Sequence, residues 1–158
     1  MFKIIVALDS DLAIGYQGWM PWDLPEDLQH FKDTTDGSNL LMGSTTFMGL
    51  KRPLPNRKTY VVSSKPVAES ENVVWVSDLT TFINKHKNSD TDIFVCGGAS
   101  IYKQLLPYTK EMIISLVNGK HKSDTLFPSF EAELFDKQLI KTYVDFKVFR
   151  YIRKGEIA

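Results

Sequence analysis

Short apolar runs alternate with helical patterns along nearly the whole chain, and this alternation constrains the fold more than any other feature. Strands are predicted over residues 2–8, 39–43, 58–64, 72–77, 92–98, 110–117 and 142–155. Helices are predicted over residues 23–35, 44–50, 79–87 and 99–106. Strands that alternate with helices form an α/β domain around a mostly parallel sheet. We therefore expect one domain over residues 1–158.

Local patterns refine this architecture. The run "FKIIVAL" (2–8) is nearly all apolar, as in a strand covered on both faces. The tail 142–155 alternates apolar and polar residues, which indicates a half-buried antiparallel strand at the sheet edge and makes the sheet mixed. Asp23 and Glu26 have the spacing of a capping box for the first helix, and Asp78 is placed to cap the third.

The composition excludes several classes of protein. Lys+Arg and Asp+Glu both number 19 in 158 residues, so a net charge near zero argues against nucleic acid or an anionic membrane as the main partner. The single cysteine, Cys96, fits a reducing compartment, and the N-terminal apolar run is too short for a signal peptide, so we expect a cytoplasmic protein. The three histidines show no metal-ligand spacing, and we expect no metal site. No large apolar stripe stands out, which favours a monomer.

Ligands of parallel α/β sheets bind at the carboxyl ends of the strands, so the loops that follow the strands are the candidate site segments. These are residues 9–22, 43–46, 63–65 and 96–100. The last contains Gly97 and Gly98, which allow the backbone to approach a ligand closely but also suit a plain tight turn. The hydroxyl-rich "GSTT" and "SSK" suit phosphate binding or simple helix capping. Together, the three loops favour a dinucleotide.

Asp27 occupies an unusual place in the first predicted helix. At about 100° per residue it lies on the same side as Leu24 and Phe31, which should face the core. One interpretation is a first-turn carboxylate that points to solvent and is stabilised by the helix dipole. The other is a partly buried carboxylate that hydrogen-bonds a ligand. Helix position alone leaves both open.

Two further groups have open interpretations. Arg52 and Arg57 flank a proline-containing loop, and a guanidinium fixed against the sheet would bind a carboxylate with two parallel hydrogen bonds. A solvated basic loop is the alternative. Trp19 and Trp22 lie in the loop before the first helix, where they either line a pocket or hold the loop in place.

Seven segments, in order and spacing, resemble dihydrofolate reductases over essentially the whole chain. They are "IVALDSDLAIG" (5–15), "MPWDLPEDLQHFK" (20–32), "LMGSTTF" (41–47), "RPLPNRK" (52–58), "VVSS" (61–64), "VCGGASIYKQLLP" (95–107) and "DTLFP" (124–128). The resemblance implies a mixed eight-stranded sheet with four main helices. It also implies reduction of 7,8-dihydrofolate to tetrahydrofolate by hydride transfer from NADPH, with protonation of the pterin at N5.

The resemblance assigns roles to residues around the substrate. Asp27 would bind the pterin, Ser115 would hydrogen-bond Asp27, Trp22 would hold a water, and Tyr102 and Met20 would lie near the reacting rings. The remaining substrate-binding residues would be Ile5, Ala7, Leu28, Phe31, Lys32, Leu50, Arg52, Leu54, Arg57 and Cys96, with Arg57 on the glutamate α-carboxylate.

The resemblance also assigns the cofactor site. Its residues would be Ala7, Ile14, Gly15, Gly18, Met20, Gly43, Ser44, Thr45, Thr46, Val62, Ser63, Ser64, Cys96, Gly97, Gly98, Ala99, Ser100, Ile101 and Tyr102. Ile14, Gly15 and Met20 would belong to a loop that closes over the nicotinamide, and Asp124 would latch that loop through backbone hydrogen bonds. The peptide bond between Gly97 and Gly98 is cis in the family.

The chain departs from the family where members often carry Arg or Lys near the cofactor's 2′-phosphate. Serine stands at positions 44, 77 and 100, and neutral donors bind phosphate less strongly than charged ones, so the preference for NADPH over NADH is expected to be weaker. Three alternatives remain: a related pterin or pyrimidine reductase, a non-catalytic pterin-binding module, and a flavodoxin-like nucleotide binder. The proposed glutamate anchor argues against the first, and the last lacks a recognisable phosphate loop.

Overall fold

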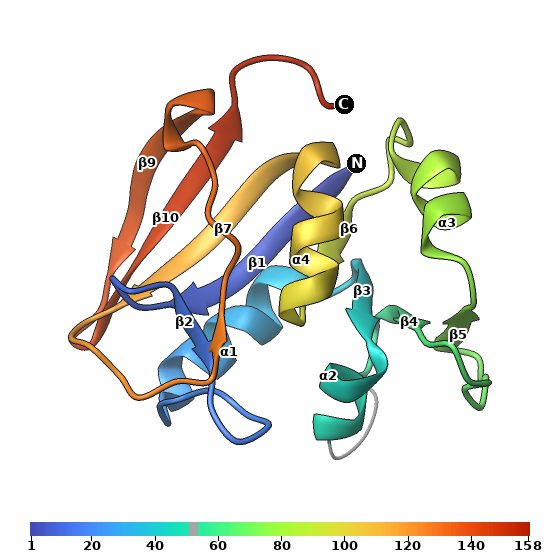
Figure 1. Ribbon diagram of the computed structural model, residues 1–158, viewed down its shortest axis with the longest axis horizontal. Helices are drawn as coiled ribbons and strands as arrows, with labels where there is room; N and C mark the ends of the chain where they lie inside the picture. Colours follow the sequence, from blue (N-terminus) through green and yellow to red (C-terminus); the bar gives the residue numbers. More distant parts are fainter. Residues whose placement is uncertain (51–53) are drawn as a thin grey trace.

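The computed structural model describes residues 1–50 and 54–158 and is built around one eight-stranded sheet (Figure 1). The spatial order of the strands is β5-β4-β3-β6-β1-β7-β10-β9. Their bounds are Phe2–Leu8 (β1), Asn39–Gly43 (β3), Lys58–Val62 (β4), Val73–Val76 (β5), Ile93–Val95 (β6), Thr109–Val117 (β7), Phe135–Thr142 (β9) and Phe146–Arg153 (β10). The first six are parallel, whereas β10 is antiparallel to both β7 and β9. The predicted mixed sheet is confirmed.

The edge of the antiparallel half differs from the expectation. The C-terminal strand β10 is antiparallel, as predicted, but it lies inside the sheet, and the edge position belongs to β9. No strand was predicted over 135–142, because the segment lacks an alternation of apolar and polar residues. The structure gives the reason: only Phe135 of this strand is buried. A second, two-stranded sheet also went unpredicted; it pairs β2 (Ala13–Gly15) with β8 (Thr125–Leu126).

The four predicted helices are present and cover both faces of the sheet (Figure 1). They are α1 (Pro25–Thr35), α2 (Ser44–Gly49), α3 (Leu79–His86) and α4 (Ala99–Leu105), with short 3-10 turns at Leu106–Tyr108 and Ala132–Leu134. The predicted Asp78 cap is confirmed, since its carboxylate accepts from the Thr81 N–H. The predicted capping box is wrong: α1 begins one residue later than the pattern requires, with Leu24 as N-cap and no side-chain cap.

The core lies on both faces of β1, which explains its continuous apolar sequence. Ile4, Val6 and Leu8 pack with α3 and α4 on one face, whereas Ile5 and Ala7 face α1 and α2 on the other. This alternation follows the two-residue period of a strand. Because β1 is flanked by β6 and β7, its carboxyl end lies in the middle of the sheet edge toward which all six parallel strands run.

Candidate active site

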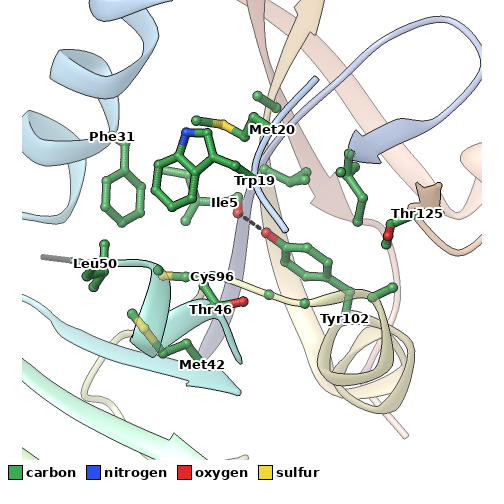
Figure 2. Close-up of a pocket in the computed structure, with 18 of the residues that line it drawn as sticks. Ile5, Trp19, Met20, Phe31, Met42, Thr46, Leu50, Cys96, Tyr102 and Thr125 are labelled. Atoms are coloured by element: carbon green, nitrogen blue, oxygen red, sulfur yellow. Dashed lines mark hydrogen bonds between the residues drawn. The ribbon is translucent and has the colours of Figure 1, made fainter. Parts of the chain in front are cut away.

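A cavity of about 480 Å³ opens at the carboxyl ends of the parallel strands, between α1, α2 and the turn after β6. It gathers side chains from segments far apart in the sequence, several of which Figure 2 draws around one opening. The predicted site residues that line it are Ile5, Ala7, Ile14, Gly15, Gly18, Met20, Asp27, Leu28, Phe31, Lys32, Thr45, Thr46, Leu50, Leu54, Cys96, Gly97, Gly98, Ala99, Ser100, Tyr102 and Ser115.

Asp27 is the carboxylate at the inner end of this cavity. It is only 6% exposed. Its place in the helical repeat puts it on the inward, apolar face of α1, as the sequence predicted. Ser115 reaches it from β7, where it pairs with Ala7 of β1. Burial raises the pKa of Asp27, and the Ser115 hydroxyl and the nearby His30 lower it by less, so the net shift is upward. The solvent-facing interpretation of Asp27 is therefore wrong.

Trp22 is buried behind the cavity rather than in its lining. Its indole Nε1 finds no hydrogen-bond partner among the described residues. The ring packs edge-on against His121, with 4.9 Å between the ring centres. His121 Nδ1 lies 3.1 Å from Oδ2 of the fully buried Asp9, and the same oxygen accepts from the His121 N–H at 2.9 Å. These contacts fix both ends of the loop that precedes α1.

Tyr102 is buried and Cys96 is half-buried, and both side chains stay protonated. The Tyr102 hydroxyl donates to the Ile5 carbonyl at 2.9 Å, the dashed contact in Figure 2. Burial raises the pKa of both the Tyr102 phenol and the Cys96 thiol, and the thiol also donates to the Phe94 carbonyl at 3.4 Å. Neither group is poised to act as a nucleophile or base, so both shape the cavity as neutral side chains.

Bare backbone forms the wall between β3 and β6. The Gly97–Gly98 peptide is cis, as the resemblance implies, and Gly97 has φ +113°, a conformation that favours glycine. A Cβ on Gly97 would lie 3.4 Å from the Tyr102 ring, and one on Gly43 would lie 3.4 Å from Ile101. Side chains at these glycines would fill the space beside the cavity. The turn is held by the Gly43 N–H, which donates to the Gly97 carbonyl at 2.9 Å.

Several predicted cofactor residues lie outside the cavity lining. They are Gly43, Ser44, Val62, Ser63, Ser64 and Ile101. Ile101 is part of the core beneath the glycine turn, whereas the others stand at or just after the carboxyl ends of β3 and β4. Because these two strands are parallel neighbours, the serine-rich segments share one edge of the sheet, beyond the cavity.

Arg57 stands in an adjoining polar pocket of about 350 Å³ that also includes Lys32. The guanidinium is buried, and three of its N–H groups are used inside the protein: Nε donates to Thr35 Oγ1 at 3.1 Å, Nη2 to the Lys32 carbonyl at 2.6 Å, and Nη1 to the Pro55 carbonyl. A guanidinium has five N–H groups. One therefore remains on each terminal nitrogen, and the Asp36 carboxylate lies 3.9 Å from Nη2. The other predicted arginine, Arg52, lies outside the described residues.

Comparison with known proteins decides the family. Residues 1–149 match the family model of dihydrofolate reductase. The chain belongs to the dihydrofolate reductase family. Dihydrofolate reductases are NADPH-dependent oxidoreductases, and this is the activity that the chain carries.

Curated and solved dihydrofolate reductases support this assignment along the chain. The Bacillus subtilis enzyme is 37% identical over 83% of this chain and 77% of its own length. The Buchnera aphidicola enzyme is 33% identical over 88% of this chain and 86% of its own. A solved dihydrofolate reductase from Enterococcus faecalis, in complex with NADP(H) and RAB-propyl, matches with a TM-score of 0.86 and 29% identity, covering 98% of this chain and 97% of that one.

The loop that the family resemblance expected to close over the cavity is latched as predicted. The Asp124 carboxylate accepts from the Gln17 N–H at 2.9 Å, and the Asp124 N–H donates to the Gly15 carbonyl at 2.9 Å. These contacts continue the pairing of β2 with β8, so the small second sheet also helps to hold this loop in place.

Several lining residues were missed from the sequence. They are Val6, Tyr16, His30, Met42, Gly49 and Thr125. Trp19 also lines the cavity, which confirms the pocket-lining interpretation for this tryptophan. Trp19 and Tyr16 fall in the candidate segment 9–22, and His30 follows Asp27 by three residues on the same helix, so position gave a signal for these three. No sequence pattern pointed to Gly49, because it belongs to the site only through its contact with Trp19, which is distant in the sequence. Among the described residues, no three His, Cys, Asp or Glu side chains are grouped to hold a metal ion, and no helix could span a membrane.

Proposed function

We propose that this chain reduces 7,8-dihydrofolate at C6 with Asp27 as its one ionised group in the pterin site. The observation that carries the proposal is a carboxylate buried at the inner end of an apolar cavity, with Ser115 as its neighbour. Such a carboxylate needs further donors, and the 2-amino group and N3–H of a pterin supply two. The bound carboxylate polarises the pterin and favours protonation at N5.

Trp22 and the Met20 loop would control the water that brings this proton. The Trp22 Nε1–H is buried without a protein partner among the described residues, which suits a donor that holds one ordered water. Met20 lines the cavity near its opening, so the loop position sets whether water reaches N5. Ile5, Leu28, Phe31, Leu50 and Leu54 would pack on the pterin and benzoyl rings.

Arg57 would hold the far end of the substrate. Its two remaining N–H groups, one on each terminal nitrogen, match the two oxygens of the glutamate α-carboxylate. The three internal hydrogen bonds keep the guanidinium from turning away. Lys32, which lines both pockets, would support the charge of the same tail.

The residues also fit NADPH. The glycine turn presents bare backbone to the cavity, Gly97 has a φ that favours glycine, and the Thr46 hydroxyl stands beside Gly98. Ala7, Ile14, Gly15, Gly18, Met20, Thr45, Ala99, Ser100 and Tyr102 would complete the nicotinamide end, with Ser44, Val62, Ser63 and Ser64 toward the 2′-phosphate. When bound, NADPH supplies the hydride. Serine at positions 44, 77 and 100, where the family often carries Arg or Lys, supports a reduced preference for NADPH over NADH.

We further propose a monomeric, cytoplasmic protein of one domain. The edge strand β9 carries Lys137 and Lys141, and charged edge strands discourage pairing between copies. Leu139, Ile140 and Val144 are also exposed on or just after β9, and the two lysines stand among these apolar residues.

The test follows the loss of reduced-nicotinamide absorbance with 7,8-dihydrofolate, using NADPH and NADH side by side. Turnover with NADPH supports the proposal, and comparable turnover with both cofactors supports the weakened phosphate site. Binding of dihydrofolate without turnover by folded protein would instead indicate a non-catalytic pterin-binding module. Turnover of another pterin alone would indicate a related reductase.

A further inference from the structure

Trp19 is a large, half-exposed aromatic side chain at the mouth of the cavity. It is 45% exposed and lines the cavity from the loop before α1 (Figure 2). At this position the indole extends the apolar surface of the cavity outward, and exposed apolar surface that is continuous with a groove marks a ligand site. Nothing in the assigned machinery uses it.

A short hairpin holds Trp19 in place. The Tyr16 N–H donates to the Trp19 carbonyl at 2.7 Å, and the Trp19 N–H donates back to Tyr16 at 3.2 Å. The two residues between them, Gln17 and Gly18, have φ of 51° and 84°, as in the two-residue turns that suit hairpins. The Asp124 carboxylate accepts from the Gln17 N–H, so the hairpin is tied to the body of the protein. The indole therefore sits on an ordered arm.

The arm reaches across the cavity to α2. A Cβ built on Gly49 would lie 3.0 Å from Cζ3 of Trp19, tighter than most real Cβ contacts, so the indole would have to shift. Gly49 does not have a left-handed φ, so the backbone would accept alanine, and the lack of a side chain serves the approach of the indole. Trp19 thus spans the opening from the hairpin to the end of α2, next to Leu50.

We propose that Trp19 is a specificity-determining residue: its indole forms the outer wall over the part of the cavity that takes the aminobenzoyl ring of dihydrofolate. This inference rests on the proposed placement of the substrate between Asp27 and Arg57. A ligand held at both of these points carries its aromatic ring between them, where Phe31, Leu50 and Leu54 provide the apolar walls. The exposed face of the indole would pack against that aromatic ring.

The test compares two substrates at saturating NADPH: 7,8-dihydrofolate, and 6-methyl-7,8-dihydropterin, which has the pterin but neither the ring nor the glutamate. In Trp19→Ala, KM and Kd for dihydrofolate are expected to rise about tenfold, which corresponds to about 1.4 kcal/mol. The constants for the dihydropterin should change less than twofold, and Trp19→Phe should recover most of the loss. Met48→Ala, a 79% exposed residue of α2 outside the cavity lining, is the control.

A second variant tests the contact itself. Gly49→Ala should displace the indole and raise KM for dihydrofolate a few-fold, and this effect should vanish when Trp19 is already alanine. Equal effects of Trp19→Ala on both substrates, a rise in the KM for NADPH in place of that for dihydrofolate, or additive effects of the two substitutions would each overturn the inference. Failure of the wild-type chain to reduce either substrate would overturn the proposed function, and this inference with it.

Discussion

Replacing Asp27 with asparagine separates the charge of this side chain from its shape. Asparagine keeps one acceptor oxygen and presents an NH₂ group where the second acceptor stood, so one of the two hydrogen bonds to the pterin is lost and the other loses its charge assistance. A hydrogen bond to a charged group is worth about 1.5–3 kcal/mol, or roughly 10- to 150-fold in binding. The carboxylate also assists proton transfer, and losing this assistance lowers the rate by a further factor of about 10²–10⁴. We expect kcat/KM at pH 7 to fall about 10³-fold or more.

The pH profile makes this expectation specific. In acid the solvent protonates the substrate without help from a carboxylate, so the deficit of Asp27→Asn should shrink as the pH is lowered from 8 toward 5. The measurement is kcat/KM for dihydrofolate across this range at saturating NADPH. A loss below tenfold at pH 7, or a deficit that stays constant with pH, would refute the role given to Asp27.

The same variant should be more stable than the wild type at neutral pH. Burial raises the pKa of Asp27, so between its ordinary and its raised value the folded chain holds a proton that the unfolded chain has released. Stability therefore falls as the pH rises through this window and stays lower above it, by about 1.4 kcal/mol for each unit of displacement. Asparagine removes this cost. Urea unfolding should show the gain at pH 7 and its disappearance below the ordinary pKa of an aspartate; a less stable variant at pH 7 would contradict the argument.

Three more outcomes follow from the contacts described above. Arg57→Lys keeps the charge but loses the pair of parallel N–H groups that binds a carboxylate. KM for dihydrofolate should therefore rise roughly 10- to 150-fold, while turnover of 6-methyl-7,8-dihydropterin is unchanged. Burial acts to raise the pKa of Asp9, but hydrogen bonds from Ala13 and His121 outweigh it and lower that pKa; the stability gained is present above the ordinary pKa and lost in acid, so Asp9→Asn should flatten the acid side of a plot of Tm against pH. Leu41→Ala, at a fully buried position of β3, should lower the free energy of unfolding by about 2–5 kcal/mol in urea titrations.

The sequence predicted those parts of the fold whose signal lies within a few residues. The continuous apolar run of β1 predicted a strand covered on both faces, and the helical spacing of Asp27 with Leu24 and Phe31 predicted an inward side; the structure agrees with both. β9 escaped because an edge strand buries little and so leaves almost no apolar pattern. The capping box failed because Leu24, rather than Asp23, stands at the start of the hydrogen-bonded turns of α1.

Local sequence patterns alone could not predict how the site residues are arranged in space. The resemblance placed most lining residues correctly, since order and spacing carry the family's topology. It missed Trp19, whose position depends on a glycine 30 residues away that permits close approach, and such a pair leaves no periodicity in the sequence. The internal partners of Arg57 were equally unreadable, because two of them are carbonyls, which every residue has.

Those carbonyl partners have a consequence for how the chain can vary over evolutionary time. Because the guanidinium of Arg57 is held by the main chain at Lys32 and Pro55, side-chain substitutions at these two positions leave its acceptors in place. Among the described residues, the side-chain partners that mutation can remove are the Thr35 hydroxyl and the Asp36 carboxylate, which lies 3.9 Å from Nη2. Substitution of Lys32 would therefore change the charge beside the substrate tail without turning the guanidinium that anchors the carboxylate.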